Sequence, residues 1–337
     1  MIKISRRLLP VAALALALTA CKDTGTTTGN TPPPDKDTAQ KTAVQVPATF
    51  NADSAYAEVA TQVAFGPRTP GSKAQKDCAA WMQRQLGAVC DTVYRQETTV
   101  KGGDGKMLPC INLIGSIHPK ATRRFLLLTH WDSRPWADQD TKDKDKPIMA
   151  ADDAGSGVGV LIEVARAMKG QPLPENVGVD ILFTDVEDYG RTEWGDDSYC
   201  LGTQYWALHP HVPGYKAEWG ILLDMVGARG ARFPMEQSSG QYNPTLQQQV
   251  WAAAGRAGVS GFFPSTPGGG VVDDHKFVNE LAHIPTIDII SLSDQTRTGF
   301  AAHWHTHADD MPLIDKATLE AVGRTLLQVL YESAQNL

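Results

Sequence analysis

Short apolar runs alternate along the chain with longer segments in which apolar residues recur every three or four positions. The short runs predict β-strands, and they lie at residues 112–115, 124–129, 179–184, 220–225 and 284–290. The longer segments predict amphipathic helices, and they lie at residues 74–86, 157–169, 244–257 and 316–330. Because strands alternate with helices, the pattern predicts an α/β fold: a single globular domain with a central, mostly parallel, doubly wound sheet flanked by helices.

Residues that can bind a metal follow several of these apolar runs. In doubly wound sheets, sites form beyond the carboxyl ends of the strands. The residues found there are His130, Asp152, Asp153, Glu187, Asp188, Asp224 and a group of histidines at 303–307. Histidines combined with several carboxylates form the set of side chains that a zinc hydrolase or a zinc transferase needs.

Glu187 and Asp188 give the most specific local signal. Adjacent carboxylates at the end of a strand cannot point the same way, so one can bind a metal while the other serves as acid and base. The alternative is a solvated loop, which the following Tyr189 and Gly190 also suit. Asp224 lies within an apolar strand, where an unpaired carboxylate is costly, so we expect it to meet a metal, a donor or a shared proton.

Two other positions each have an ordinary structural explanation beside the functional one. His130 suits either a metal site or a satisfied position in the core. Asp152 and Asp153 precede a helix, where acids also serve as N-terminal caps. Two adjacent acids exceed what a cap needs, and this favours a functional role.

The C-terminal third leaves more alternatives open. Asp273 lies in a flexible approach to a helix, so capping and function are equally compatible with it. Segment 303–307 holds three histidines, and spacing alone does not choose among them. Asp309 and Asp310 follow this segment and are expected at the surface.

Size and charge narrow the class of protein. A chain of 337 residues with 42% hydrophobic content is long enough for one large α/β domain or two smaller ones. No internal repeat and no second domain is visible in the pattern. The net charge is −7, and no cluster of Lys and Arg combines with aromatic residues. The protein is therefore not expected to bind nucleic acid.

The N-terminus has the features of an export signal. A basic region precedes an apolar stretch that is too short to span a membrane comfortably, and residues 1–20 therefore predict a lipoprotein signal peptide. Cys21 would be lipidated, residues 21–48 would form a disordered tether, and residues 49–337 would form the folded domain. This order predicts a lipid-anchored protein of the bacterial cell envelope, on the periplasmic or extracellular side. The alternative is a plain secretory signal that happens to contain a cysteine.

Four further cysteines could form disulfides in an exported chain. They are Cys78, Cys90, Cys110 and Cys200. The pair Cys78–Cys90 is the first expectation, because both lie in or shortly after the same helical stretch. Unpaired buried thiols are the alternative.

Seven short motifs carry a family resemblance: residues 65–72 (FGPRTPGS), 129–134 (THWDSR), 153–157 (DAGSG), 183–188 (FTDVED), 223–228 (LDMVGA), 273–275 (DDH) and 304–306 (WHT). From about residue 65 to the C-terminus, the chain resembles the M28 zinc aminopeptidase superfamily. Within it, the chain is most similar to the animal-type, zinc-dependent glutaminyl-peptide cyclotransferases and their bacterial relatives.

The resemblance implies a set of roles within a zinc-dependent catalytic domain. It implies one catalytic zinc ion per chain, held by Asp153, Asp188 and His305. It implies that Glu187 is the general base and acid. The residues that it places beside the substrate are a hydrogen-bonded carboxyl pair, Asp224 and Asp273, and four further side chains, Trp194, Phe300, Trp304 and His130.

The implied activity is cyclisation of an N-terminal glutamine. Zinc would polarise the γ-carbonyl of the glutamine, and Glu187 would move a proton from the α-amine to the departing ammonia. The partners would be peptides or proteins that begin with Gln, and the enzyme would be a monomer.

Two other functions remain open. A co-catalytic aminopeptidase with two zinc ions would use five ligands, all present here: His130, Asp153, Asp188, Asp224 and His305. A lipoprotein that binds peptide termini without catalysis is the third possibility. The DDH motif at 273–275 and the aromatic residues favour cyclisation.

Overall fold

The computed structural model describes residues 49–335. The predicted export signal, Cys21 with its predicted lipid and the whole of the predicted tether therefore lie outside the described residues. None of the helices in residues 49–335 has both the length and the apolar character needed to cross a membrane.

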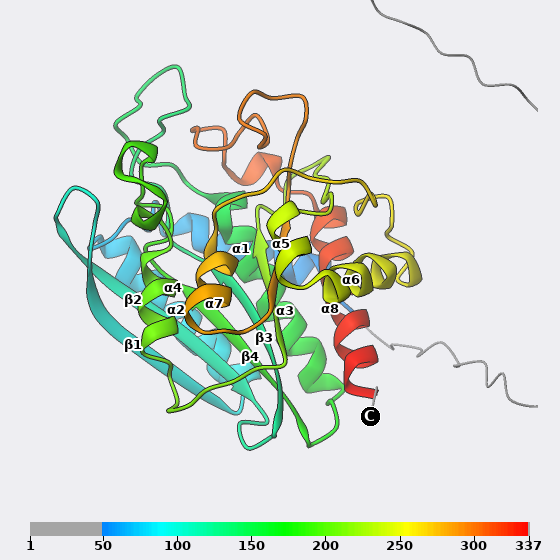
Figure 1. Ribbon diagram of the computed structural model, residues 1–337. Coiled ribbons are helices and arrows are strands. Elements are labelled where there is room, and N and C mark those ends of the chain that lie inside the picture. The colour runs from blue at the N-terminus through cyan, green and yellow to red at the C-terminus, as the bar shows by residue number, and fades with distance from the viewer. Residues whose placement is uncertain (1–48, 336–337) are drawn as a thin grey trace, which may run out of the picture. The chain divides into compact units, whose positions relative to one another are not determined.

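Within residues 49–335, a six-stranded mixed sheet forms the centre of the fold (Figure 1). Its strands are β1 (Thr92–Lys101), β2 (Met107–Ile117), β3 (Arg123–His130), β4 (Val177–Thr184), β5 (Trp219–Asp224) and β6 (Thr286–Ile290). Across the sheet they follow the order β1-β2-β4-β3-β5-β6. The strands from β4 to β6 run parallel, whereas β2 pairs antiparallel with both β1 and β4. The predicted α/β sheet is confirmed, with an antiparallel hairpin added at one edge.

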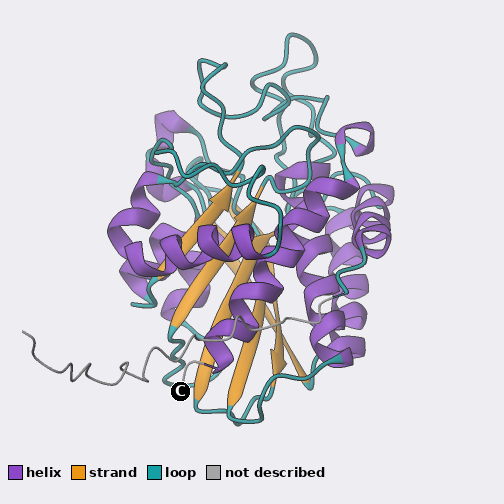
Figure 2. Ribbon diagram, turned by 90° about the vertical axis from the view of Figure 1, so that its right-hand side faces the viewer, coloured by secondary structure: helices purple, strands orange, loops and turns teal. Residues whose placement is uncertain are grey.

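Helices cover both faces of the sheet (Figure 2). They are α1 (Ala52–Ala64), α2 (Lys73–Val89), α3 (Gly157–Gly170), α4 (Leu201–Leu208), α5 (Gln237–Tyr242), α6 (Pro244–Arg256), α7 (Asp274–Leu281) and α8 (Lys316–Gln335). Side chains alternate along a strand, so Phe125 and Leu127 of β3 join one buried cluster and Leu126 and Leu128 join another. The first cluster includes residues of α1, α2, α3, α6 and α8, and the second includes residues of α4 and α7.

The segments that the pattern missed are those with weak apolar contrast. The predicted helices correspond to α2, α3, α6 and α8, and Ser72 and Asn243 cap the first turns of α2 and α6 with their side chains. β1 was not predicted, because it is an edge strand whose residues are largely polar and partly exposed. The short helices α4, α5 and α7 span too few turns for a clear helical period. The longer helix α1 was also not predicted; its buried face includes an alanine and a glutamine beside two valines.

The predicted Cys78–Cys90 disulfide is wrong: all four cysteines of the described chain are free thiols. Cys78 lies on α2, and Cys90 follows directly after the last residue of this helix. A continuous helix rises about 1.5 Å per residue, which separates the two by roughly 18 Å along its axis. A disulfide requires Cα atoms within about 7 Å of each other.

A buried ion pair joins the two central strands at the end of the sheet opposite the candidate site. Arg124 of β3 donates two hydrogen bonds to Asp180 of β4, at 2.6 and 2.7 Å, and one to Ser116 of β2. The hydroxyl of Tyr215 also donates to Asp180, at 2.8 Å. Asp180 is fully buried, so its charge depends on these donors.

We expect Arg124→Ala to lower the free energy of unfolding by about 3–5 kcal/mol, because it leaves the Asp180 carboxylate buried without its cation. The matched control is Arg123→Ala, which removes the neighbouring but partly exposed pair with Glu218 and should cost about 1 kcal/mol or less. Urea denaturation of the two variants measures the difference. Equal losses would contradict this account of the buried pair.

Candidate active site

Neighbouring strands of the sheet end at, or just before, the residues that carry the candidate chemistry. β3 ends at His130 and β5 at Asp224, while β4 ends at Thr184, three residues before Glu187. Since these strands are parallel, their carboxyl ends meet at one edge of the sheet. Figure 2 shows the long loops gathered at that edge.

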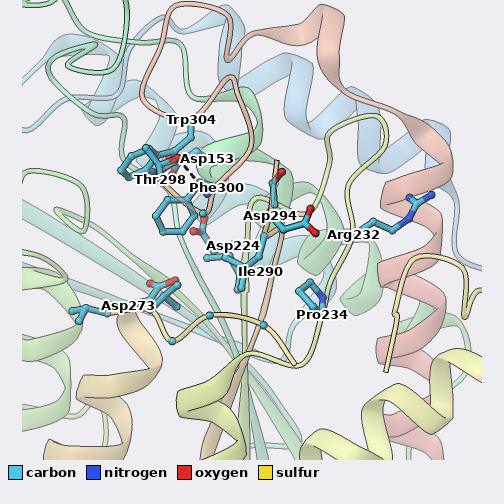
Figure 3. Close-up of a pocket in the computed structure, with 18 of the residues that line it drawn as sticks. Asp153, Asp224, Arg232, Pro234, Asp273, Ile290, Asp294, Thr298, Phe300 and Trp304 are labelled. Atoms are coloured by element: carbon cyan, nitrogen blue, oxygen red, sulfur yellow. Dashed lines mark hydrogen bonds between the residues drawn. The ribbon is translucent and has the colours of Figure 1, made fainter. Parts of the chain in front are cut away.

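A cavity of about 640 Å³ opens beside the strand ends (Figure 3). The charged side chains that line it include Asp153, Glu187, Asp188, Asp224, Asp273 and His305. Phe300 and Trp304 contribute an aromatic wall, with ring centroids 4.5 Å apart, and segment 264–272 contributes another wall. A charged end combined with apolar walls is typical of a small-molecule site.

Asp153, Asp188 and His305 form a compact group of potential metal ligands. One donor atom from each lies within 4.8 Å of the others, and all three side chains are buried. The Nε2 atom of His305 lies 3.3 Å from Asp188 Oδ1 and 3.9 Å from Asp153 Oδ2. Ligand atoms placed tetrahedrally about 2 Å from a zinc ion lie roughly 3.3 Å apart, so the spacing suits zinc.

The charges of this group also fit a divalent cation. Asp188 is 2% exposed, yet among the described residues its Oδ2 atom has no hydrogen-bond partner. The guanidinium of Arg134 lies 2.7 Å from the other oxygen, Oδ1, and it is one positive charge among several carboxylates. Burial favours the neutral form of Asp188, but His305 and Arg134 outweigh burial and lower its pKa. Two carboxylates and an imidazole leave a fourth zinc position for a substrate.

A second group of potential ligands shares Asp153 with the first. It consists of His130, Asp153 and Asp224. The Nε2 atom of His130 lies 3.0 Å from Asp153 Oδ1 and 3.3 Å from Asp224 Oδ1. The two oxygens of Asp153 therefore face the two groups separately. His130 itself is almost completely buried beneath these carboxylates and does not line the cavity.

Arg134 and Asp138 hold the ligands of the first group from behind. Arg134 donates to the side chain and to the backbone carbonyl of Asp188, and also to the carboxylate of Asp138. The same carboxylate oxygen of Asp138 lies 3.4 Å from Nδ1 of His305. A carboxylate behind a ligand histidine fixes the orientation of the ring. The sequence pattern did not identify Asp138, which lies in a loop with other acids.

Other buried acids position the backbone that carries the site. Asp132 accepts hydrogen bonds from the backbone N–H groups of Glu187 and Asp188, at 3.0 and 3.2 Å. Asp309 accepts from the N–H groups of Asp152 and Asp153, at 2.7 and 3.1 Å. The expectation that Asp309 lies at the surface is wrong, because it is fully buried beneath the ligand loop.

Asp152 has a structural role instead of the functional one that its position favoured. It accepts hydrogen bonds from the N–H groups of Gly227 and Ala228, at 2.7 and 3.0 Å, and its other oxygen lies 2.8 Å from a ring nitrogen of His303. Both oxygens are therefore partnered. Of the two adjacent acids, Asp153 lines the cavity and Asp152 does not.

Glu187 lies beside the ligand group without belonging to it. Its side chain is buried, lines the cavity and accepts a hydrogen bond from the thiol of Cys200 at 3.2 Å. Burial raises the pKa of Glu187 well above its usual range; the nearby His130 opposes this effect, and Asp188 adds to it. A carboxylate in this place can exchange protons with a molecule in the cavity.

Asp224 and Asp273 approach the cavity from β5 and from the start of α7. Burial, assisted by Asp153, raises the pKa of Asp224 to about 7. Burial also raises the pKa of Asp273, with Asp224 as the next cause. No hydrogen bond joins the two side chains in the described structure; Asp273 instead accepts from the N–H group of Asp274 and caps α7. Asp273 therefore both caps α7 and lines the cavity.

Glu236 fixes the wall formed by segment 264–272. It accepts hydrogen bonds from the N–H groups of Ser238, Ser239 and Val271. Burial would raise its pKa, but the imidazole of His275, whose Nε2 atom lies 3.5 Å away, and the hydrogen bond from Ser239 outweigh burial and lower the pKa to about 2. The carboxylate therefore ties the glycine-rich wall to the first turn of α5.

Trp194 lies apart from the other two predicted aromatic wall residues. Phe300 and Trp304 line the cavity, whereas Trp194 does not. Its ring packs against Trp136 and Tyr189, with centroids 5.9 and 6.2 Å apart. The short helical turn Thr192–Trp194 directs the ring into this cluster, and Gly103 leaves room for it.

Several residues with a left-handed backbone flank the site. Val186 and Met225 have φ angles of 56° and 48°, and His305 has a φ of 57°. A β-branched residue such as Val186 rarely adopts this conformation. Backbone strain of this kind concentrates at functional sites, where the surrounding structure must hold it.

Comparisons with known proteins place the chain in a family and identify its relatives. The profile described as peptidase family M28 matches residues 112–330. A solved glutaminyl cyclase of Porphyromonas gingivalis is 47% identical, with a TM-score of 0.82 over 85% of this chain and 99% of that chain. A solved Zn-dependent exopeptidase of Parabacteroides distasonis is 46% identical, with the same TM-score and coverage. The glutaminyl-peptide cyclotransferase of Bos taurus is 22% identical over 77% of this chain and 76% of its own length.

We expect Asp138→Asn to weaken zinc binding by about 10–100-fold, because it removes the negative charge behind His305. The matched control is Asp145→Asn, an exposed acid of the same loop, which should leave the affinity unchanged. Competition with a chromogenic chelator measures both affinities. Equal affinities in the two variants would show that Asp138 does not act on the ligand.

Proposed function

Because the chain belongs to peptidase family M28 and has bacterial glutaminyl cyclases among its solved relatives, we propose that it is an enzyme that cyclises the N-terminal glutamine of peptides to pyroglutamate and releases ammonia. The predicted resemblance to glutaminyl-peptide cyclotransferases is confirmed by these relatives. One observation carries the proposal: Glu187 lines the same cavity as the potential ligands Asp153, Asp188 and His305 but lies outside their group.

The three potential ligands would hold one zinc ion at the inner end of the cavity. When bound, zinc supplies a Lewis acid that polarises the γ-carbonyl of the substrate glutamine. Arg134 and Asp138 keep Asp188 and His305 oriented toward this position. The chain's own contribution here is to place three ligands while leaving room for the substrate.

Glu187 is the residue that transfers the proton in this reaction. The α-amine of the substrate attacks its own γ-carboxamide carbon, so that a ring C–N bond forms and the bond to the amide nitrogen breaks. Glu187 accepts a proton from the amine and delivers it to the departing nitrogen, which leaves as ammonia. Both nitrogens belong to one residue, so a single carboxylate can serve both in turn. No water takes part in this reaction.

The cavity walls favour cyclisation by enclosing the glutamine side chain. Phe300 and Trp304 present stacked apolar faces beside the ligand group, and the ring of Trp304 also stacks on that of His305. Enclosure between apolar walls restricts the flexible side chain and brings its reacting atoms together. Asp224 and Asp273 lie on the same cavity, where their carboxyl groups can receive hydrogen bonds from the substrate amine.

A co-catalytic aminopeptidase is the second candidate, and one observation favours it. In the group His130, Asp153 and Asp224, as in the first ligand group, one donor atom from each residue lies within 4.8 Å of the others, so this group could hold a second ion. The exopeptidase relative is compatible with that alternative. The number of bound metal ions separates the two functions.

We also propose that residues 1–20 direct export and that a lipid on Cys21 holds a monomeric catalytic domain in the bacterial cell envelope. The basic and apolar regions of the N-terminus and the LTAC motif support this proposal. Fatty-acid labelling of the intact chain, absent from Cys21→Ala, would support it. Equal labelling of both chains would refute it.

We expect one tightly bound zinc ion per chain, retained in Asp224→Asn and lost in Asp188→Asn. Asp188 belongs only to the first ligand group and Asp224 only to the second. Elemental analysis after dialysis measures the zinc content. Two ions per chain, together with release of free amino acids from peptides, would favour the aminopeptidase.

We expect Glu187→Gln to lower the rate of ammonia release from a Gln-initiated peptide by at least about 100-fold, because the amide cannot accept the proton. Zinc content should stay at the parental value, since Glu187 is not a ligand. Mass spectrometry of the peptide and a coupled ammonia assay measure the change. An unchanged rate would remove Glu187 from the reaction, and a parental protein that binds such peptides without converting them would indicate a binding protein.

A further inference from the structure

The thiol of Cys200 contacts the carboxylate that is proposed to move the proton. Its Sγ atom lies 3.2 Å from Oε1 of Glu187 and has hydrogen-bond geometry. Cys200 is completely buried, and Glu187 is nearly so. The pattern of the sequence gave Cys200 no role beyond a possible disulfide, and the structure leaves it a free thiol.

Two backbone hydrogen bonds hold the two segments together around this contact. The N–H group of Cys200 donates to the carbonyl of Glu187 at 2.9 Å, and that of Leu201 donates to Val186 at 3.0 Å. Cys200 therefore contacts Glu187 through both its backbone and its side chain. The start of α4 and the loop after β4 form one unit at the wall of the cavity.

The backbone of Cys200 is left-handed, with φ and ψ of 54° and 32°. This conformation is strained for a residue with a side chain, whereas glycine adopts it freely. A turn with no other duty would suit glycine or asparagine. A cysteine here supplies a side chain to Glu187 in spite of the strain.

The thiol can act only as a donor to this carboxylate. Burial, and then the charge of Glu187, raises the pKa of Cys200 well above its usual value, so the sulfur keeps its proton. The S–H group then donates to Oε1, while Oε2 of Glu187 accepts no hydrogen bond from residues 49–335. One oxygen of the carboxylate is held and the other is left for the substrate.

We propose that Cys200 is a positioning residue: its thiol holds Oε1 of Glu187 so that Oε2 meets the amine of the substrate. The inference rests on the proposed cyclase function and on Glu187 as its base. A thiol is a weak donor, so it can orient the carboxylate while withdrawing little of its capacity to accept a proton.

The kinetic test compares Cys200→Ala, Cys200→Ser and a matched control, Cys78→Ala. Cys78 is an equally buried free thiol on α2 that does not line the cavity. We expect Cys200→Ala to lower kcat about tenfold with an unchanged KM, because the substrate still binds while the base loses its orientation. Cys200→Ser restores a donor and should keep kcat within about threefold of the parent. Cys78→Ala should keep the parental kcat.

A spectroscopic test measures the contact itself without reference to activity. The infrared S–H stretching band of Cys200 is isolated as the difference between the parent and Cys200→Ala. Removal of the acceptor in Glu187→Ala should shift this band to higher frequency, whereas the band of Cys78 should stay in place. Melting temperatures and zinc contents establish that each variant is folded and loaded.

The outcomes separate the inference from the function on which it rests. A parental kcat in Cys200→Ala, a Cys200→Ser variant as slow as Cys200→Ala, or an S–H band that Glu187→Ala does not move would overturn the positioning role. A parent that releases no ammonia from Gln-initiated peptides would instead overturn the proposed function. The shift of the S–H band would still report the contact in that case.

Discussion

The site depends on keeping several carboxylates close together while hiding them from water. Two unit charges of like sign 4 Å apart repel by about 4 kcal/mol near a protein surface, and by more inside it. Arg134 and the buried histidines His130 and His305 offset part of this repulsion around Asp153, Asp188 and Asp224. The part that is not offset makes the cavity a strong site for a divalent cation. A sheet packed on both faces supplies the stability that such a concentration of charge requires.

The acids divide into two kinds according to what their oxygens contact. Asp132 and Asp309 accept backbone N–H groups with both oxygens, and they thereby fix the loops on which the functional acids stand. Asp188, Asp224 and Asp273 each keep one buried oxygen without a hydrogen-bond partner in the described structure. Asp132 and Asp309 are thus saturated by the protein, whereas Asp188, Asp224 and Asp273 each retain an oxygen that a metal or a substrate can contact. This difference is a property of three-dimensional contacts. Even adjacent acids are placed differently: Asp153 lines the cavity, whereas Asp152 does not and has both oxygens hydrogen-bonded elsewhere.

The sequence therefore predicted the location of the site better than the roles of its acids. Apolar runs followed by polar residues were sufficient for the parallel strands and for His130, Asp224 and the Glu187–Asp188 pair at their ends. Edge strand β1 has no strong apolar period, so it could not be found in this way. Asp309 resembles a surface acid in sequence, because the peptide groups that it accepts come from residues about 150 positions away. The position of Trp194 could not be predicted for a local reason. The short turn Thr192–Trp194 determines which cluster its ring joins, and the spacing of apolar residues does not reveal such a turn.

The left-handed residues explain how the strand ends are redirected into one cavity. A strand that continued straight would carry its next side chains alternately to opposite faces of the sheet. Left-handed conformations at Val186, Cys200 and Met225 reverse the chain next to Glu187 and Asp224 instead. Each of these positions bears a side chain where glycine would be less strained, and Val186 and Met225 are buried in the surrounding packing. The strain is held because the side chains of these residues are packed or hydrogen-bonded. The direction in which Glu187 and Asp224 face the cavity is therefore a consequence of tertiary structure.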